Sequence, residues 1–455
     1  MASPQLTPQP VDAETAQRFG SGPNRSSTPR SDHRRTPSSD ERVSLLDRWL
    51  LNKLLQRVNC PSLAVRLWNG ETVLAGDAAP DVTVVLPDRR TFRELIRDPF
   101  FQFGEAYSDG RLQIVGRSMV DFLRILDSAI DRGKATDQTG RKWWPLGRRR
   151  SRSNSLAASQ QNIQHHYDIG NSFYREWLDR QLVYTCAYFE EPGTSLEAAQ
   201  IAKMDHVCRK VWLQPGQTVI EAGCGWGAFA LHMARYYGVT VRAYNISKEQ
   251  VAYARQRAQD EGLQDRVEFI QDDWRTITGH CDVFVSVGML EHVGRENYPK
   301  LGRTIRRSLN PGGRGLIHSI GQNRPQPFDR WIEQRVFPGA YPPTLAEMMN
   351  VFEDSRISVL DVENIRLHYA ETLWHWLQRF ERSTGRITRM FDERFVRMWR
   401  LYLAGSFVAF EDDRLQLYQV LFSPEKENGI PRNRRYQYDE CGEPTRFDER
   451  IDPAR

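Results

Sequence analysis

The feature that most constrains the fold of this chain is a regular alternation of short apolar strands with helices between residues 218 and 317. The predicted strands cover 218–222, 239–244, 267–270, 282–287 and 315–317, and the helices cover 228–237 and 249–260. Alternation at this spacing is typical of an α/β domain with a doubly wound parallel sheet. A further helix is expected over 196–213, where Thr194 and Glu197 have the spacing of a capping box.

A glycine-rich loop, Glu221-Ala-Gly223-Cys-Gly225-Trp-Gly227, joins the first of these strands to the helix that follows it. Glycines at such a turn let the backbone bend tightly and approach a ligand whose carboxylate lies near a helix N-terminus. The spacing differs from the G-x-G-x-x-G of dinucleotide sites, and the loop has no Gly-Lys-Ser/Thr of a P-loop. The acid before the glycines suits an ammonium group, as on the methionine part of S-adenosylmethionine. A tight turn without a ligand is the alternative.

Polar residues also follow the next two predicted strands. Asn245 ends the second strand and Gln250 follows it, while Asp272, Asp273 and Trp274 come at the end of the third. Ligands of open α/β sheets bind beyond the carboxyl ends of the strands. Taken singly, each residue could be a helix cap or a core aromatic. Together they predict a nucleoside pocket, with Asn245 at the ribose and the later residues at the adenine.

Two residues with acid–base chemistry follow the last two predicted strands. Glu291 is placed after the fourth strand and His318 after the fifth. Beside a sulfonium cofactor such a pair could bind a metal, act as a base or cap helices. Metal binding is the least favoured of these, because no third or fourth ligand is evident. No metal site is therefore predicted.

The rest of the chain suggests two folded parts with flexible ends, as expected for 455 residues. We expect a Pro- and Ser-rich disordered tail over 1–42 and a small α+β domain over 43–132. A basic linker is expected over 133–161, the larger α/β domain over 162–430, and a polar tail over 431–455. Within the small domain, a strand near residues 63–68 is expected to enter a hairpin turn at Asn69-Gly70.

The positive charge of the chain is concentrated in the predicted linker. The net charge is +5, and it becomes about −1 when one short basic stretch is left out: Arg141, Lys142, Arg148, Arg149, Arg150 and Arg152. Local charge of this kind suits a polyanionic surface better than groove-wide DNA binding, so no nucleic-acid partner is predicted. The neighbouring pair Trp143-Trp144 suits a membrane interface, where each basic residue contributes ~1 kcal/mol. A solvated tether remains an equal alternative.

Targeting and cysteine signals are weak. No apolar run approaches the ~20 residues that span a bilayer, and the first forty residues lack an apolar signal core. The six cysteines are scattered without a C-x-x-C pair, which argues against a disulfide framework and a zinc site. We therefore expect a cytoplasmic protein that contacts membranes at their surface.

Several motifs, in order over residues 161–424, closely resemble the cyclopropane-fatty-acyl-phospholipid synthase family, which includes the mycolic-acid cyclopropane synthases. The matching stretches are His165-His-Tyr-Asp-Ile-Gly170-Asn, Tyr184-Thr-Cys186-Ala-Tyr-Phe189, Glu221 to Gly227, Ile246-Ser-Lys-Glu-Gln250, Leu290-Glu-His-Val-Gly294, Ile317-His-Ser-Ile-Gly321 and His368-Tyr369-Ala-Glu-Thr-Leu373. The preceding part, with Phe103-Gly-Glu-Ala-Tyr-Ser-Asp-Gly110, resembles the N-terminal lipid-engaging domain of the branch that acts on phospholipids.

This resemblance implies a Rossmann-like S-adenosylmethionine-dependent transferase that converts cis double bonds of phospholipid acyl chains into cyclopropane rings. It further implies a bound bicarbonate as general base, and by position the contacts of that ion fall on Cys186, Glu291, His318, Ile320 and Tyr369. Tyr184 and Thr185 match positions that touch the cofactor. The implied partners are unsaturated acyl chains and a membrane surface. The sequence does not fix the oligomeric state, and a homodimer is left open.

Three other functions stay open at this stage. One is a methyltransferase of the same fold that stops before ring closure and gives a methyl-branched acyl chain. The second is a small-molecule N-methyltransferase, and the third is a lipid-binding protein without catalysis. Leu403 stands where the family often has a cysteine, which bears on the substrate or branch.

Overall fold

The computed structural model describes residues 42–76, 79–136, 169–429, 431 and 433–438. Its described residues from Val43 onward belong to one compact unit. The predicted N-terminal tail, the basic stretch of the linker with its tryptophan pair, His165 and His166, and residues 439–455 lie outside the described residues. The predictions made for those segments therefore remain predictions.

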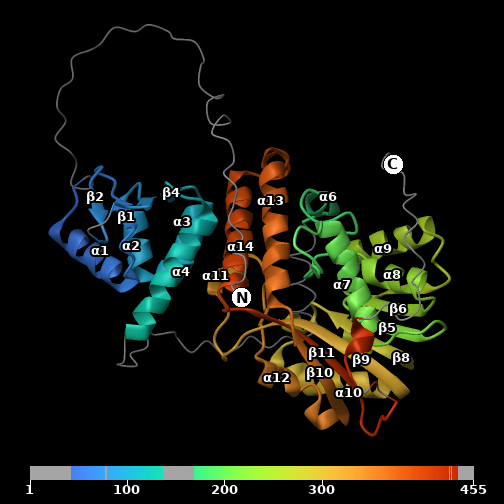
Figure 1. The fold of residues 1–455 in the computed structure, drawn as a ribbon. Helices are drawn as coiled ribbons and strands as arrows, with labels where there is room; N and C mark the ends of the chain where they lie inside the picture. The colour runs from blue at the N-terminus through green and yellow to red at the C-terminus, as the bar shows by residue number, and fades with distance from the viewer. Residues whose placement is uncertain (1–41, 77–78, 137–168, 430, 432, 439–455) are drawn as a thin grey trace. The chain divides into compact units, whose positions relative to one another are not determined.

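The first part of the chain forms a four-stranded sheet with helices packed on it (Figure 1). Its elements are α1 (Leu45–Val58), β1 (Leu63–Arg66), β2 (Thr72–Leu74), β3 (Val82–Val85), α2 (Arg89–Arg97), α3 (Pro99–Ser108), β4 (Gln113–Val115) and α4 (Met119–Thr136). The strand order is β2-β1-β3-β4. The turn at Asn69-Gly70 joins antiparallel β1 and β2 as predicted, and Gly70 has φ +85°. Helix α4 extends to Thr136 and so overlaps the start of the predicted linker.

A seven-stranded sheet forms the centre of the second part. Its strands are β5 (Thr218–Ala222), β6 (Thr240–Asn245), β7 (Val267–Gln271), β8 (Cys281–Val287), β9 (Leu309–Gly321), β10 (Ile357–Asn364) and β11 (Gln416–Pro424), in the order β10-β11-β9-β8-β5-β6-β7. The five strands from β5 to β9 are parallel, which confirms the predicted α/β fold. The sheet is not wholly parallel, because β11 runs antiparallel to both of its neighbours.

Helices cover both faces of this sheet. They are α6 (Asn171–Tyr174), α7 (Leu196–Lys210), α8 (Ala228–Tyr236), α9 (Lys248–Asp260), α10 (Tyr298–Ser308), α11 (Arg330–Arg335), α12 (Leu345–Met349), α13 (Arg366–Met390) and α14 (Glu393–Glu411). Figure 1 shows α7, α8 and α9 together on one side and α10 and α12 on the other. Side chains alternate between the faces: Val219 of β5 packs in the cluster of α7, α8 and α9, and Ile220 in the cluster of α10 and α12.

The N-cap residue of α7 differs from the predicted one. Ser195, not Thr194, is the N-cap, and its side chain accepts a hydrogen bond from the backbone N–H of Ala198. Thr194 instead donates to the carbonyl of Glu191. Glu197 forms an ion pair with Arg379 of α13, at 2.7 Å. The predicted capping box was wrong because this ion pair takes up the acid that the box requires.

The first part of the chain packs against α14 and α11 of the second part. Arg124 of α4 donates twice to the carboxylate of Glu411, both at 2.6 Å. Glu105 of α3 accepts from the indole of Trp331 at 3.0 Å and from the guanidinium of Arg335. Side chains from both parts also belong to one buried apolar cluster, which runs from Leu51 to Leu417. The first part of the chain is thus packed on α14, the helix that includes Leu403.

Two glycines inside helices give opposite expectations for stability. A Cβ added to Gly302 of α10 would lie 1.7 Å from the carbonyl oxygen of Val351, whereas one added to Gly385 of α13 would have no heavy atom within 4 Å. We therefore expect Gly302→Ala to destabilise the fold by about 1–3 kcal/mol through overpacking. Gly385→Ala is expected to stabilise it by up to about 1 kcal/mol through helix propensity. Denaturant unfolding measures both, and equal midpoints for the two variants would contradict this close packing.

Candidate active site

The glycine-rich loop leaves β5 and enters α8 through three residues with positive φ. The φ angles of Gly223, Gly225 and Gly227 are +88°, +52° and +83°. A Cβ on Gly227 would lie 2.6 Å from the ring of Phe269, so this position excludes any side chain. The backbone N–H of Gly223 donates to the carbonyl of Tyr244 at 2.9 Å. The loop is therefore fixed against the end of β6, as the prediction of a ligand-binding turn requires.

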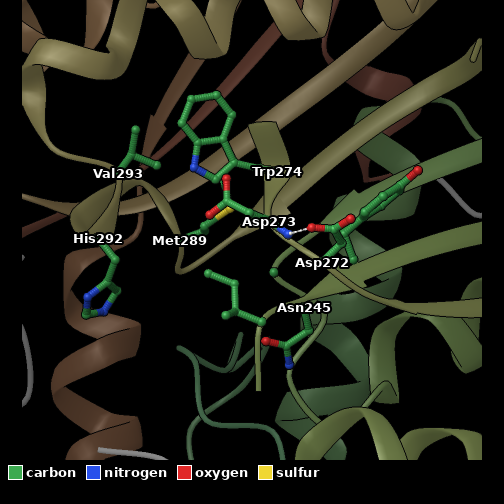
Figure 2. Close-up of a pocket in the computed structure, with 10 residues that line it drawn as sticks. Asn245, Asp272, Asp273, Trp274, Met289, His292 and Val293 are labelled. Carbon is green, nitrogen blue, oxygen red and sulfur yellow. Dashed lines mark hydrogen bonds between the residues drawn. The ribbon is translucent and has the colours of Figure 1, made fainter. Parts of the chain in front are cut away.

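A pocket opens beside this loop at the carboxyl ends of the strands (Figure 2). Its lining includes four residues predicted for the nucleoside: Asn245, Asp272, Asp273 and Trp274. The full lining is Gly223, Tyr244, Asn245, Ile246, Asp272, Asp273, Trp274, Met289, His292 and Val293. The structure thus brings the first glycine of the loop and these four residues to one cavity. The edge of the sheet places them there, because β5, β6 and β7 are parallel neighbours.

The residues predicted to bind the nucleoside make different hydrogen bonds and ion pairs within the protein. The carboxylate of Asp273 forms an ion pair with Arg275 at 2.9 Å, and Asp272 accepts from the backbone N–H of Asp273 at 2.8 Å. The side-chain amide of Asn245 donates to the carbonyl of Gly225 and to Gln250, at 3.1 and 2.8 Å. Gln250 is buried and does not line the pocket. Asn245 and Gln250 therefore brace the loop, and Asn245 also lines the cavity together with Asp272 and Trp274.

Glu221, the acid before the glycines, is buried in the fold. Its Oε2 atom has no hydrogen-bond partner among the described residues. Burial raises the pKa of its carboxyl, and the nearby Lys203 ammonium of α7 opposes that rise. Lys203 is itself only 2 % exposed and donates to the hydroxyl of Thr185 at 3.0 Å. A buried acid with one unpartnered oxygen fits a cationic group, such as the ammonium of a methionine moiety.

Tyr184 and Thr185 lie on the segment that α7 holds in place. Gln200 of α7 donates to the carbonyl of Thr185 at 2.8 Å. The hydroxyl of Tyr184 lies 2.8 Å from that of Tyr402 on α14. A Cβ on Gly288, at the end of β8, would lie 3.0 Å from the Thr185 methyl group. Thr185 therefore lies between Gln200 and Lys203 of α7 and the end of β8, from which the chain continues to Glu291.

Glu291 and Ile320 meet directly. The backbone N–H of Ile320 donates to Glu291 Oε1 at 2.5 Å, while Glu291 Oε2 is buried and has no hydrogen-bond partner among the described residues. Burial raises the pKa of Glu291 to about 7. One oxygen is thus anchored, and the other is available to a ligand. The Ile320 N–H, predicted as a contact of the anion, is already used to hold the acid.

The strand that was predicted to end at residue 317 continues past His318. His318 lies inside β9, opposite Gln419 of β11, and not beyond the strand. The strand continues to Gly321 because β11 pairs with it along this length, which the sequence pattern could not show. The backbone N–H of Gly288 donates to the His318 carbonyl at 2.8 Å. Burial lowers the pKa of the His318 imidazole well below its usual range, so the ring is neutral.

Cys186 and Tyr369 form a second group. Thr372, one turn after Tyr369 on α13, accepts from the backbone N–H of Ala187 at 3.0 Å. Cys186 is fully buried, its thiol donates to the carbonyl of Ala187, and burial raises the pKa of the thiol. Tyr369 is buried, and its ring makes an edge-to-face contact with Trp376 and a tilted contact with Phe410. The thiol is therefore buried and un-ionised, and it is not a nucleophile.

Sequence reasoning missed several residues around the site. Lys203 and Gln200 are buried on α7 at i, i+3 spacing, and Gln419 is buried at hydrogen-bond distance from His318. Met289 and His292 line the pocket beside the predicted residues. A signal did exist for Lys203 and Gln419: each is a polar residue within a stretch of otherwise apolar positions. Their partners lie far away in the sequence, so the pattern could not supply them.

The described residues provide neither a cluster of metal ligands nor a membrane-spanning helix. Across the described ranges, no group of three or more His, Cys, Asp or Glu side chains is arranged to hold a metal ion. Within the same ranges, no helix has the length and apolar character needed to cross a bilayer.

The glycine-rich loop between β5 and α8, the buried acid before it and the pocket beyond the strand ends of a mostly parallel seven-stranded sheet define an S-adenosylmethionine-dependent methyltransferase. Comparison with known families then gives the particular group. The model of the family described as mycolic acid cyclopropane synthetase matches residues 154–420, and a family described as a domain of unknown function matches residues 50–134. This chain belongs to the mycolic acid cyclopropane synthetase family.

Individual relatives agree with this assignment. A probable fatty acid methyltransferase of Pseudomonas putida is 35% identical over 81% of this chain and 93% of its own. The cyclopropane-fatty-acyl-phospholipid synthase of Escherichia coli K12 is 32% identical, over 78% and 91%. Among solved structures, the cyclopropane synthase MmaA2 of Mycobacterium tuberculosis has a TM-score of 0.55 at 29% identity, covering 58% of this chain and 97% of its own. Mycolic acid cyclopropane synthase CmaA1, solved with SAH and CTAB, has the same TM-score at 28% identity, covering 58% and 97%.

Proposed function

We propose that this enzyme adds the methyl carbon of S-adenosylmethionine across a cis double bond of a phospholipid-bound acyl chain and closes a cyclopropane ring, with bicarbonate as the general base. The observation that carries this proposal is the state of Glu291. One carboxylate oxygen is anchored to the Ile320 N–H at 2.5 Å, and the other is buried without a partner among the described residues. A buried acceptor of this kind suits the O–H of a small oxyanion.

The residues of the chain then have distinct tasks. Glu221 and the loop from Gly223 hold the methionine part of the cofactor, and Asp272 and Trp274 hold the adenine. S-Adenosylmethionine supplies an electrophilic methyl group. When the alkene takes up that methyl group, a carbocation-like centre forms, and ring closure requires loss of a proton from the new methyl. A protein carboxylate at that place could be alkylated by the cation or collapse onto it.

An exchangeable oxyanion avoids this problem. In this proposal Glu291 accepts its O–H, and the neutral His318 and the Tyr369 hydroxyl donate to it, so that the ion is held and its charge is tuned. General-base catalysis of this type contributes about 10²–10⁴-fold. The un-ionised thiol of Cys186 and the buried aromatic side chains around Tyr369 keep the neighbourhood apolar. An apolar cavity protects a cation from capture by water.

A second product is favoured by two relatives. They are named as a probable fatty acid methyltransferase and as a tuberculostearic acid methyltransferase, at 35% and 31% identity. If the proton were lost from the chain carbon beside the cation, the product would be a methyl-branched chain and not a ring. Leu403, fully buried on α14, occupies the position where a cysteine was expected. A small-molecule N-methyltransferase has less support: the coclaurine N-methyltransferase, at 23% identity, shares the fold alone.

The proposal also includes peripheral contact of a cytoplasmic enzyme with the membrane, through the part of the chain before residue 133 and the basic linker. Helix α1 supports it, because three large apolar side chains are exposed near its start: Leu45, Leu46 and Trp49 are 85%, 62% and 51% accessible. Lys53 lies over the Trp49 ring at 3.9 Å. Exposed indole and leucine side chains beside a cation suit the headgroup region of a bilayer.

The product decides between the two reactions. The purified enzyme is incubated with S-adenosylmethionine, bicarbonate and vesicles of a cis-monounsaturated phospholipid, and the acyl chains are analysed by mass spectrometry. We expect chains heavier by one CH₂ that take up no hydrogen under mild hydrogenation. Chains of the same mass that take up hydrogen would indicate a methylated alkene and overturn ring closure. Modification of free fatty acid but not of vesicles would overturn the phospholipid substrate.

A further inference from the structure

A row of polar side chains crosses the three neighbouring strands β9, β11 and β10. His318 of β9 lies opposite Gln419 of β11, and Gln419 lies opposite Glu363 of β10. Residues that face each other across antiparallel strands direct their side chains to the same face of the sheet. His318 and Gln419 are each 1 % exposed, and Gln419 Nε2 lies 3.1 Å from His318 Nδ1. One ring nitrogen of His318, Nδ1, is therefore engaged by Gln419.

The charges around His318 keep its imidazole neutral. Burial has the largest effect on its pKa, and the neighbouring Lys203, Lys210 and His206 side chains of α7 lower the pKa further. Glu363 acts in the opposite direction, but it is already paired with His206 at 2.8 Å and with Lys210. A neutral imidazole has one N–H donor and one acceptor nitrogen. Which nitrogen has the proton is set by the hydrogen bond that the other one makes.

The orientation of the Gln419 amide decides the tautomer. With Nε2 facing His318, the amide donates and Nδ1 accepts, so the ring proton is on Nε2. The other amide atom, Oε1, is buried and has no partner among the described residues. Within the described part of the chain, the observed orientation leaves Oε1 and one N–H of the amide unsatisfied, whereas reversing the amide would leave both N–H donors unsatisfied, and unpaired buried donors are the rarer kind. Each buried unsatisfied group has a desolvation cost, so the donating orientation is the more stable one.

We propose that Gln419 is a positioning residue that keeps His318 in the neutral tautomer with its proton on Nε2, so that the ring offers an N–H donor to an anion held by Glu291. The tautomer with its proton on Nδ1 would present a lone pair to the same anion and repel it. Gln419 acts through His318 and does not itself touch a reacting atom. The role of the anion rests on the proposed function, whereas the tautomer itself does not.

The test compares Gln419→Met and Gln419→Glu with the matched control Gln416→Met, all in the full-length protein. Gln416 lies on the same strand, is also 1 % exposed, and bonds to Asp413 and Asn364 away from His318. Protein labelled with [¹⁵N]histidine is examined by long-range ¹H–¹⁵N NMR, and His318→Asn assigns the signal. In the unmodified protein we expect an unprotonated Nδ1 and a protonated Nε2. Gln419→Glu is expected to move the proton to Nδ1.

Kinetics provide the second readout. Gln419→Met is expected to lower kcat by about 10–100-fold and to raise the bicarbonate concentration needed for half-maximal rate, with KM for S-adenosylmethionine within about 2-fold. Gln416→Met is expected to keep kcat within about 2-fold. A protonated Nδ1 in the unmodified protein, or equal kinetic losses in the two methionine variants, would overturn the proposal. A rate independent of bicarbonate would instead reject the proposed base and leave the tautomer result intact.

Discussion

Replacing Glu291 with glutamine is expected to lower kcat by about 10³-fold while the affinity for S-adenosylmethionine changes by no more than about 3-fold. The amide oxygen of glutamine can still accept from the Ile320 N–H, which anchors the carboxylate at 2.5 Å. The second oxygen, however, becomes an NH₂ group that cannot accept the O–H of an oxyanion. Loss of a held general base costs about 10²–10⁴-fold. Transfer of labelled methyl groups into phospholipid vesicles measures the rate, and calorimetry measures the binding.

Glu347→Gln is the matched control for this experiment. Glu347 belongs to α12 and accepts from the Thr344 backbone N–H at 2.8 Å, with Arg295 as its ion-pair partner. This variant loses a carboxylate of similar connectivity outside the proposed base site, and its kcat is expected to stay within about 2-fold. A parallel fall of turnover and cofactor affinity in Glu291→Gln would show that Glu291 is a structural residue.

The same residue predicts how the rate depends on pH. Burial raises the pKa of Glu291 to about 7, so its carboxylate predominates above that pH and its protonated form predominates below it. Only the carboxylate can accept the O–H of bicarbonate. We therefore expect kcat to fall as the pH drops below 7, and Glu291→Gln to shift this limb to lower pH, where only the protonation of bicarbonate itself lowers the rate. A wild-type profile that is flat between pH 6 and 8 would contradict a carboxylate role for Glu291.

Glu221→Gln is expected to weaken S-adenosylmethionine binding by about 10–100-fold. The buried Oε2 of Glu221 has no partner among the described residues and is suited to an ammonium group. Hydrogen bonds to charged groups contribute about 1.5–3 kcal/mol, which corresponds to this loss. At saturating cofactor, kcat should stay within about 5-fold, because the base group is untouched. Calorimetry with S-adenosylhomocysteine, which retains the ammonium group, gives the affinity without turnover.

Glu268→Gln is a suitable control, since Glu268 lies on β7, which β6 separates from the strand of Glu221, and has an exposed side chain. Its cofactor affinity should equal that of the unmodified enzyme. Unchanged affinity in Glu221→Gln, together with a loss of stability, would assign Glu221 to the balance of charge with Lys203 and not to the cofactor.

Much of the second part of the chain could be predicted, because its signals are local. The strands from β5 to β8 and the helices α8 and α9 follow from apolar runs, and the loop after Glu221 follows from its glycines. The N-cap of α7 could not be assigned in this way, since the choice between Thr194 and Ser195 depends on the ion pair of Glu197 with Arg379. That partner lies 182 positions further along the chain.

The site was predictable in the same uneven way. Parallel neighbours bring Asn245 and Asp272 to one edge, so a rule about strand ends found the pocket. The full length of β9 was not predictable, because it depends on pairing with β11 nearly a hundred residues later. The placement of His318 inside a strand, and the contact of Gln419 with it, come from that pairing. Position along the chain contains no information about which place in the sheet a late strand will occupy.

The interior place of β11 has a consequence for synthesis. The last strand of the sheet to leave the ribosome lies between two strands that emerge earlier, β9 and β10. Until residues 416–424 arrive, β9 and β10 each present unpaired backbone groups to the cell, the kind of open edge on which aggregation begins. The nascent enzyme therefore passes through an aggregation-prone stage late in translation. Its yield in a cell depends on how quickly the nine-residue strand β11 is inserted between β9 and β10.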